Sequence, residues 1–359
     1  MATFTGKLNS NEIFASLFNM IISQQVFADN IKGTGSSILD SARVDGSMSG
    51  DTKLYYSTDV LQSYEWGNDA EAENLLKLYR PKAPEVQSIT LDVFRQIPLT
   101  VDNYLSKRAW GSESSFSEFN SVMLGWIRNT KKVYDATTYN AFIGTAKSSK
   151  AAENISVDVT TAVTGLTGEE KARVEAQTIA EAIAKLMSRL KDMSRDYNDY
   201  GYMRSYEMDD LLFVFNEDAI AKIEKRDLPT IFHKDIIEQM GKSSLPARFF
   251  GDVNSGATKG DGVKVRSLIE QTIGSNHYFA GDLIATSDTA PAGKSYTVND
   301  KVLFKVIHKG PASVPYMSAF EVGTSFFNPK SLTETHYLTW GHNTLEYLKE
   351  FPYITVVQA

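Results

Sequence analysis

The stretch DYNDYGYMRSYE, residues 196 to 207, carries oxygen-bearing side chains at a spacing that suggests calcium chemistry. Four residues fall on positions 1, 3, 6 and 12 of an EF-hand loop: Asp196, Asn198, Gly201 and Glu207. Position 5 is Tyr200, which has no carboxylate, and position 9 is Arg204, a cation directed at a cation site. We therefore favour a tyrosine-rich connector that packs its rings between lobes over a weak calcium site.

Phosphate binding is the second chemistry to test, at LLFVFNEDAIAKI, where a strand pattern runs directly into a helical pattern. A phosphate-binding turn needs glycines, so that backbone N–H groups can approach the anion at the positive end of the helix. This junction has no glycine, and Glu217 and Asp218 in the first turn would repel a phosphate. Asn216 is a typical N-cap. Both GKS tripeptides, at 241–243 and 293–295, lack the earlier glycine of a Walker loop. The junction therefore predicts structural core.

Histidines and carboxylates do not assemble into an acid–base site. The chain has five His and no Cys, and it contains no GxSxG motif. His336 and His342 are six residues apart, which places them about 20 Å apart on a strand or about 240° apart around a helix. Asp209 and Asp210 would point to opposite faces of a strand. The sequence therefore predicts no catalytic residue, no metal site and no cofactor, and we expect that the protein is not an enzyme.

The amino-acid composition excludes further classes of protein. The 359 residues carry a net charge of -7 without a block of Lys or Arg, so the basic stripe of a specific DNA reader is missing. The absence of Cys fits folding in a reducing cytosol. The length predicts two or three lobes. The apolar stretch IFASLFNMII (13–22) is too short to span a membrane, and we expect an amphipathic helix there that lies on a neighbouring subunit.

Two long helices are predicted in the middle of the chain. A capping box at Ser115 and Glu118 begins the first, from about Phe116 into the 140s, and Thr167 with Glu170 begins the second. The first helix is expected to turn these residues inward: Phe119, Met123, Trp126, Thr130, Val133 and Thr137. The second is expected to turn these inward: Val174, Ile179, Ile183, Leu186, Leu190 and Met193. A shorter helical segment is expected at 233–241.

Strand patterns lie before and after these helices. Between 54 and 66 the even positions are mostly apolar or β-forming, and between 88 and 99 apolar residues alternate with polar ones. These two runs are expected to pair as a long projecting hairpin, with an acidic helical patch at 68–79 between them. Further strands are expected at DLIAT, KVLFKVI and FPYITVV, and one short strand within 147–167. A loop or extended arm is predicted at 33–52, and loops are predicted at 251–262 and 286–300. This layout is α+β.

Four stretches spread over most of the chain carry a resemblance to a known family. They are APEVQSITLDVFRQIPLTVDNY (83–104), SFSEFNSVMLGWIRNTKKVYDATTYNAF (115–142), RSYEMDDLLFVFNEDAIAKIEKRDLPTIFHKD (204–235) and ETHYLTWGHNTLEYLKEFPYITVV (334–357). In these patterns the chain resembles the major capsid proteins of tailed phages with the Hong Kong 97-type fold. It is most similar to those of small, short-tailed Bacillus-type podoviruses (picovirus-like).

The resemblance implies a division of the chain into five parts. These are an N-terminal arm (1–43), an E-loop hairpin (44–97), a peripheral domain with a spine helix (98–149), a mostly axial domain (150–310) and return strands of the peripheral domain (311–359). It also implies that the protein assembles with itself as hexamers and pentamers in an icosahedral shell. Scaffolding protein, portal and non-specifically held double-stranded DNA are the other expected partners, and no membrane is expected. The implied location is the virion capsid, and the host cytoplasm during assembly.

Aromatic side chains on the arm and the hairpin are the expected contacts between subunits, because aromatic rings carry much interface energy. They are Tyr55, Tyr56, Tyr64, Trp66, Phe14 and Phe18. The alternative for the four hairpin residues is packing within their own subunit. Two other functions stay open at this point. One is an α+β enzyme with a scattered site, for which residues 196 to 207 are the candidate region, and the other is a different virion structural protein, tail or portal-associated.

Overall fold

The structure is a computed structural model that describes residues 37–46, 50–64, 78–102, 113–219, 241–260, 262–266 and 272–359. The chain forms two compact units. The smaller contains Phe94–Val133 and Glu321–Trp340, and the larger contains Gly35–Val93, Tyr134–Phe320 and Gly341–Ala359. Several long elements contribute residues to both units. The predicted helices at 13–22, 68–79 and 233–241 lie wholly or almost wholly outside the described residues.

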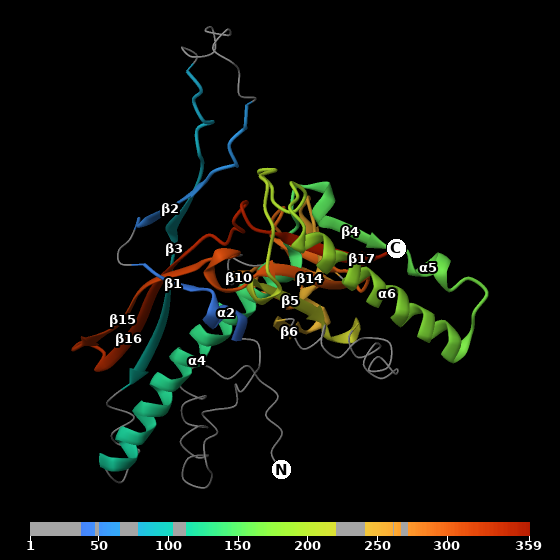
Figure 1. Ribbon diagram of the computed structural model, residues 1–359. Helices are drawn as coiled ribbons and strands as arrows, with labels where there is room; N and C mark the ends of the chain where they lie inside the picture. Colours follow the sequence, from blue (N-terminus) through green and yellow to red (C-terminus); the bar gives the residue numbers. More distant parts are fainter. Residues whose placement is uncertain are drawn as a thin grey trace. The chain divides into compact units, whose positions relative to one another are not determined.

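The larger unit is built on a five-stranded mixed sheet (Figure 1). In spatial order its strands are β4 (Asn154–Val157), β17 (Tyr353–Gln358), β14 (Val302–His308), β5 (Leu211–Asn216) and β6 (Gly241–Leu245). The central strand β14 is antiparallel to both β17 and β5. Each outer strand runs parallel to its neighbour, β4 to β17 and β6 to β5. The strands predicted at KVLFKVI and FPYITVV, and the short strand within 147–167, are confirmed.

The three central strands are buried on both faces, which explains their nearly continuous apolar sequences. Along β5, Leu211, Phe213 and Phe215 belong to one hydrophobic cluster, whereas Leu212 and Val214 belong to another. This alternation follows from the two-residue period of a strand. The predicted junction after β5 is also confirmed. The Asn216 Oδ1 accepts a hydrogen bond from the Asp218 amide (3.1 Å), and its Nδ2 donates to the Val302 carbonyl (3.0 Å).

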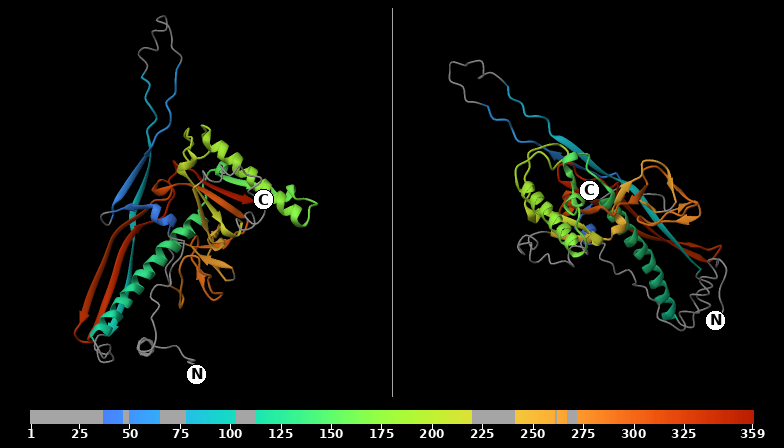
Figure 2. Two further views of the ribbon diagram at one scale, coloured as in Figure 1. Left: turned by 60° about the horizontal axis from the view of Figure 1, so that its bottom comes forward. Right: turned by 90° about the vertical axis from the view of Figure 1, so that its right-hand side faces the viewer.

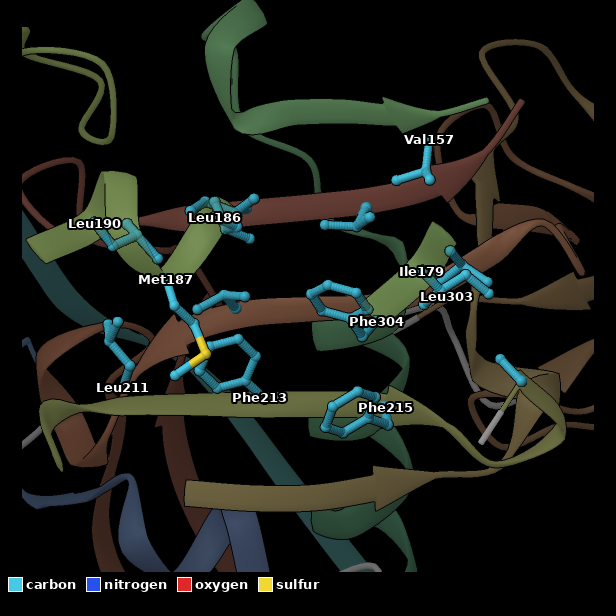
Figure 3. Packing of buried hydrophobic residues seen from close by; sticks show 14 of the residues in the cluster. Val157, Ile179, Leu186, Met187, Leu190, Leu211, Phe213, Phe215, Leu303 and Phe304 are labelled. Atoms are coloured by element: carbon cyan, nitrogen blue, oxygen red, sulfur yellow. The ribbon is translucent and has the colours of Figure 1, made fainter. Parts of the chain in front are cut away.

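One face of the sheet is covered by α6 (Gly168–Lys191). Figure 3 shows Met187 of this helix beside Phe213 of the sheet, and Leu186 and Leu190 belong to the same hydrophobic cluster as Phe213 and Phe304. Thr167 is the N-cap residue, as predicted, although its side chain makes no capping hydrogen bond.

The inward face predicted for this helix needs one correction. Val174 and Ile183 pack against the cluster, but Met193 is 74% exposed. The helix ends at Lys191, so the helical period that would have turned Met193 inward does not reach it.

The other face of the sheet is covered by the end of α4 (Glu113–Thr145). Tyr139, Phe142 and Ile143 pack there, and the Tyr139 hydroxyl donates to the Val314 carbonyl (3.0 Å). Tyr353 of β17 binds the same helix end, because its hydroxyl donates a hydrogen bond to the Ile143 carbonyl (2.9 Å). Strand β17, the segment before β15 (Tyr316–Asn328) and the end of α4 are therefore joined by tyrosine hydroxyls as well as by apolar packing.

The details predicted for α4 were wrong in two respects. The helix begins at Glu113, so Ser115 lies inside its first turn and is not the N-cap. The buried positions include Ile127, Tyr134 and Thr138, each one residue after a predicted position. From Thr138 to its end at Thr145 the helix is buried on all sides, so a single-face pattern does not describe that part.

A second five-stranded sheet contains the predicted hairpin strands. In spatial order it holds β1 (Arg43–Asp45), β15 (Tyr316–Asn328), β16 (Thr333–Asn343), β3 (Glu85–Asp102) and β2 (Thr52–Ser57). Strand β1 and the short helix α2 (Ser37–Ser41) lie where a loop was predicted at 33–52, so that prediction was wrong in part. The alternation predicted in 88–99 is confirmed, because the odd positions of β3 are the less exposed ones.

The predicted loops at 251–262 and 286–300 contain short strands instead. The three-stranded sheet is β7 (Gly251–Val253), β13 (Ser295–Val298) and β9 (Val263–Val265), and two-stranded pairs are β8 (Thr258–Lys259) with β12 (Thr289–Ala290) and β10 (Thr272–Ile273) with β11 (Asn276–His277). Gly251 is required there because a Cβ would collide with the Thr297 carbonyl oxygen. The strand predicted at DLIAT is only a single bridge, between Leu283 and Lys264.

The remaining described helices are short. They are α5 (Val159–Ala162) and the 3-10 turns η3 (Ala151–Glu153), η4 (Met208–Asp210), η5 (Ala247–Phe249) and η6 (Gly310–Ala312). Asp209 and Asp210 therefore lie in a 3-10 turn and not on a strand. Within the described ranges, no helix is long and apolar enough to cross a membrane.

The α6 face of the sheet should dominate the stability of the larger unit. We expect Phe304→Ala to lower the free energy of unfolding by about 3–5 kcal/mol, because the ring is fully buried among other rings and leaves a cavity. The matched control is Met193→Ala, which should change it by less than about 0.5 kcal/mol. Urea unfolding of the unassembled subunit measures both, and equal effects would contradict the assignment.

Candidate assembly surface

The hairpin described here consists of β2, β3 and the adjoining residues 58–64 and 78–84, and its strands have two unlike faces. Its ladder pairs Thr52 with Thr90 and continues to Ser57 with Glu85. Tyr55 turns inward and packs against a cluster that contains Ile89 and Leu91 of β3. Tyr56, the next residue, turns outward and is 61% exposed.

The even positions of β2, which carry the apolar and β-forming residues of the predicted half-buried strand, are the exposed ones. Leu54 and Tyr56 are exposed, whereas Tyr55 is half-buried and Ser57 is buried. A two-residue period predicts that the faces differ but not which face lies inward when both carry apolar residues. The alternation is therefore confirmed within β2, and the structure assigns the inward face to the odd positions.

Beyond the ladder the chain runs out into solvent. Every described residue from Val60 to Tyr64 and from Leu78 to Pro84 is exposed, and none belongs to a strand. In Figures 1 and 2 these two stretches continue from β2 and return to β3. Tyr64 is 57% exposed, and its ring lies 4.3 Å from the ring of Tyr79 on the opposite stretch. This part of the hairpin presents large apolar groups that its own unit does not cover.

The base of the hairpin is bound by ionic groups of residues 196–207, here called the tyrosine connector, and of Arg195 before it. Asp59 accepts three hydrogen bonds, from the Arg195 Nη1 (2.5 Å), from the Met203 amide (3.0 Å) and from the Val60 amide (2.9 Å). These donors, with that of Arg195 the strongest, lower the pKa of Asp59 to about 2. The carboxylate is therefore ionised at neutral pH, and charge-assisted bonds of this kind are the stronger ones.

Arg204 completes this attachment. Its Nη2 donates to the Thr58 carbonyl (2.6 Å) and to the Glu350 Oε1 (3.0 Å). The other oxygen of Glu350 accepts from the Ser57 hydroxyl (2.6 Å). Arg204 thus connects the hairpin to the segment before β17. We call this set the hairpin clasp: Ser57, Thr58, Asp59, Arg195, Met203, Arg204 and Glu350.

Gln87 of β3 supports the clasp from the second strand. Its Nε2 donates to the Tyr347 carbonyl and its Oε1 accepts from the Lys349 amide, both at 3.0 Å. The side-chain amide therefore pairs with backbone in the way that a neighbouring strand would. Both strands of the hairpin are tied to the segment from Tyr347 to Glu350.

Two of the four EF-hand positions, Asn198 and Gly201, have structural roles in this connector. Asn198 is buried and exchanges two hydrogen bonds with the backbone of Tyr202, both at 2.7 Å. The Lys150 ammonium donates to the carbonyls of Asn198 and Arg195. Among the described residues no cluster of His, Asp and Glu has the geometry to hold a metal ion. The loop therefore places a protein cation next to Asn198, and Gly201 has the positive φ (69°) that its turn needs.

The rings of the connector are packed, as the alternative interpretation predicted. Tyr197, Tyr202 and Tyr206 are buried, and the Tyr206 hydroxyl donates to the Tyr197 carbonyl (3.0 Å). Asp199 accepts from the hydroxyls of Ser148 and Tyr347, both at 2.7 Å. The connector thus joins the loop after α4 to the segment before β17 while it holds the hairpin.

A buried carboxyl lies beside this junction. Glu153 is fully buried, and its Oε1 accepts a hydrogen bond from the Tyr353 amide (3.3 Å). Burial raises the pKa of Glu153 to about 7, more than the donors near it lower it, and the Asp199 carboxylate adds to the rise. Glu153 is therefore the described carboxyl whose protonation changes near neutral pH.

The residues predicted to contact other subunits differ in their exposure to solvent. Tyr56 and Tyr64 are exposed on the hairpin, whereas Tyr55 packs within its own unit. Trp66, Phe14 and Phe18 lie outside the described residues. The hairpin clasp was not predicted. Arg204 was noticed only as a residue that disfavours calcium, and its partners are far away in the sequence.

The fold defines the class of protein. An α+β subunit with a long helix, a mixed sheet and a projecting hairpin is the Hong Kong 97-type capsid fold. It is similar to a chain in the capsid structure of Staphylococcus phage Andhra, with a TM-score of 0.58 and 11% identity over 94% of this chain and 87% of that chain. It is equally similar, at 11% identity and TM-score 0.58, to a chain in a structure of the head fiber and inner core protein gp22 of native bacteriophage P68, over 89% and 83%.

The particular family follows from the sequence. The model of the Phi29-like phage major capsid protein family matches residues 3–354, and the chain belongs to this family. A search of curated proteins finds no match. The protein is a major capsid protein that self-assembles into the shell of a phage virion.

The hairpin clasp makes a first prediction. Asp59→Ala should speed hydrogen exchange of the Met203 amide by at least about tenfold, because it removes the acceptor of that N–H. Asp40→Asn, which alters a surface pair with Arg43, is the matched control and should leave this exchange unchanged. Since the pKa of Asp59 is lowered, its stabilising contact should be present at pH 4 and disappear only as the pH falls towards 2. Unchanged Met203 exchange would show that the contact does not form.

Glu153 makes a second prediction, about pH. Its pKa rises from an ordinary 4.5 to about 7 on folding, so the folded state binds more protons in this window. Stability is therefore highest below pH 4.5 with respect to this group, and it falls as the pH rises through 7, by up to about 3 kcal/mol. Glu153→Gln should remove this fall, whereas the exposed Glu181→Gln should keep it. Urea unfolding of unassembled subunits at pH 5 and pH 8 measures the difference, and a flat wild-type profile refutes it.

Proposed function

We propose that the hairpin is the part of the subunit that reaches over a neighbouring copy in the shell, and that Tyr56 and Tyr64 are its anchors. The observation that carries this proposal is that neighbouring tyrosines of one strand differ. Tyr55 packs against apolar residues of its own unit, while the ring of Tyr56 is exposed to solvent. Aromatic groups that a free subunit leaves exposed suit burial against a partner. Trp66 would add to this surface, and Phe14 and Phe18 of the N-terminal arm would add a second contact.

We also propose the domain assignment that the family resemblance implies. It has an arm at 1–43, an E-loop at 44–97, a peripheral domain at 98–149, a mostly axial domain at 150–310 and return strands at 311–359. The clasp supports a separate role for the hairpin, because the described contacts there are concentrated at its base. Strand β17 of the last segment supplies a central strand to the sheet of the fourth.

The proposed partners extend beyond the subunit itself. Hexamers and pentamers would form an icosahedral shell with many repeated weak contacts that sum over a closed surface. Scaffolding protein, portal and non-specifically held double-stranded DNA complete the proposal, with assembly in the host cytoplasm. A net charge of -7 leaves any DNA contact to local clusters of Lys and Arg. We further propose that the role is structural and not catalytic, and that the phage is of the small, short-tailed picovirus-like kind.

The neighbouring tyrosines provide the test. Tyr56→Ser should reduce shell assembly by about tenfold or more while the unfolding temperature of the free subunit stays the same, because the ring contacts only the partner. Tyr55→Ser is the matched control, and it should lower the unfolding temperature because it removes internal packing. Negative-stain microscopy counts shells, and calorimetry measures unfolding.

Two outcomes would contradict the proposal. If Tyr56→Ser assembles as well as the wild type, the outer face of the hairpin is not an interface. If the wild-type protein forms no shells or capsomers with any assembly helper that it requires, the hairpin has no neighbour to cover.

A further inference from the structure

A cleft of about 470 Å³ lies within the larger unit, next to the base of the hairpin. It is lined by parts of the chain that are distant in sequence: Gln87 of β3, the end of α4 with Lys147, Val253, Arg266 and residues 345 to 349. Elements held together by the core sheet and by the Gln87 bonds thus surround it. The walls are fixed by the fold, and the cleft does not depend on one loop.

Arg266 is the unusual residue of this cleft. Its Nε donates to the Thr145 hydroxyl oxygen (3.1 Å), and its guanidinium carbon lies 6.0 Å from the ring centroid of Phe142. The Thr145 hydroxyl in turn donates to the Ala141 carbonyl (2.6 Å), which fixes its lone pairs towards Arg266. No carboxylate pairs with this guanidinium among the residues that the structure describes.

The location of Arg266 makes an unpaired charge costly. Burial lowers the pKa of Arg266, because the charged group is partly removed from water there. An arginine presents a planar fork that matches a carboxylate or phosphate with two parallel hydrogen bonds. An oxyanion placed on the free edge of this fork would compensate the lost solvation.

Other charges around the cleft do not neutralise it. Lys147 and Lys349 line it with Arg266, and Lys147 is paired with Asp252. Glu346 is the carboxylate in the lining, and it is exposed. The fully buried Lys305 lies behind the wall, where its ammonium donates to the Ala146 carbonyl. The cations around the cleft therefore outnumber Asp252 and Glu346.

We propose that this cleft receives a carboxylate side chain from a second copy of the chain, bound by the Arg266 guanidinium. The inference rests on assembly into a shell, where other copies are the immediate neighbours of each subunit. The chain has 44 acidic and 37 basic residues, so a second copy offers the complementary charge. Phe142, Val253 and Leu345 give the cleft apolar walls, which suit the stem of an acidic side chain better than a strongly hydrated phosphate ion.

The assembled shell provides the direct test. A cryo-electron microscopy map of wild-type shells should show a side chain of an adjacent subunit in the cleft, within about 3 Å of the Arg266 guanidinium. An empty cleft, or density for phosphate or nucleic acid, overturns the proposal but leaves the shell function intact. Failure of this inference is thus distinguishable from failure of the proposed role of the hairpin, which Tyr56→Ser tests separately.

Variants provide an independent arm. Arg266→Met keeps the apolar contact with Phe142 but removes the charge, and it should lower assembly at a fixed subunit concentration by at least about tenfold. Arg266→Lys should lower it less, because it keeps the charge without the fork. The matched control is Arg173→Met on the exposed face of α6, which should assemble normally.

The free subunit separates folding from assembly. If its unfolding temperature is unchanged in Arg266→Met, a loss of assembly supports the proposal, and normal assembly refutes it. If Arg266→Met folds poorly, the cryo-electron microscopy map of wild-type shells is the test that decides whether the proposal holds. Stabilisation of wild-type free subunits by 10 mM inorganic phosphate, but not by 10 mM acetate, would assign the cleft to a free ion and overturn the proposal.

Discussion

The burial of β14 on both faces is the constraint from which most of the structure follows. A strand with Val306 and Ile307 on opposite sides needs an apolar cover on each side. The helix α6 supplies one cover and the end of α4 supplies the other. Only the last part of α4, from Thr138 to Thr145, is buried on all sides. The one charged residue of β14, Lys305, survives there because its ammonium reaches the Ala146 carbonyl and lies 5.4 Å from the Tyr353 ring centroid.

The tyrosine connector turns this rigid core into a support for the hairpin. It follows α6 directly and leads into β5, so its ends are fixed by the two layers of the core. Arg195 and Arg204 can therefore hold Thr58 and Asp59 at defined positions. These groups are partly exposed, and an isolated pair of this kind contributes little to stability. Their effect is on direction, because several bonds at one base restrict the angle at which the hairpin leaves the unit.

The sequence predicted the elements better than their contacts. Continuous apolar runs predicted β5, β14 and β17, and the helical period with Thr167 predicted α6, because these signals are local. The inward face of β2 could not be predicted, since both faces carry apolar residues and partners elsewhere decide. The hairpin clasp could not be predicted from the sequence either, because its residues are far apart along the chain. The ion pair between Arg195 and Asp59 joins residues 136 apart in sequence, and Ser57 meets Glu350 across 293 residues.

An exposed aromatic face is compatible with a soluble free subunit only if each contact is weak alone. Tyr56 and Tyr64 carry hydroxyl groups, so the rings present apolar area without removing all polar groups from water. A shell repeats the same contact at every copy, and the sum over a closed surface makes modest contacts sufficient. An ionic contact at Arg266 would add what rings lack, a fixed direction and register. The apolar area of the hairpin would then supply most of the affinity between subunits. The charge in the cleft would fix their relative orientation.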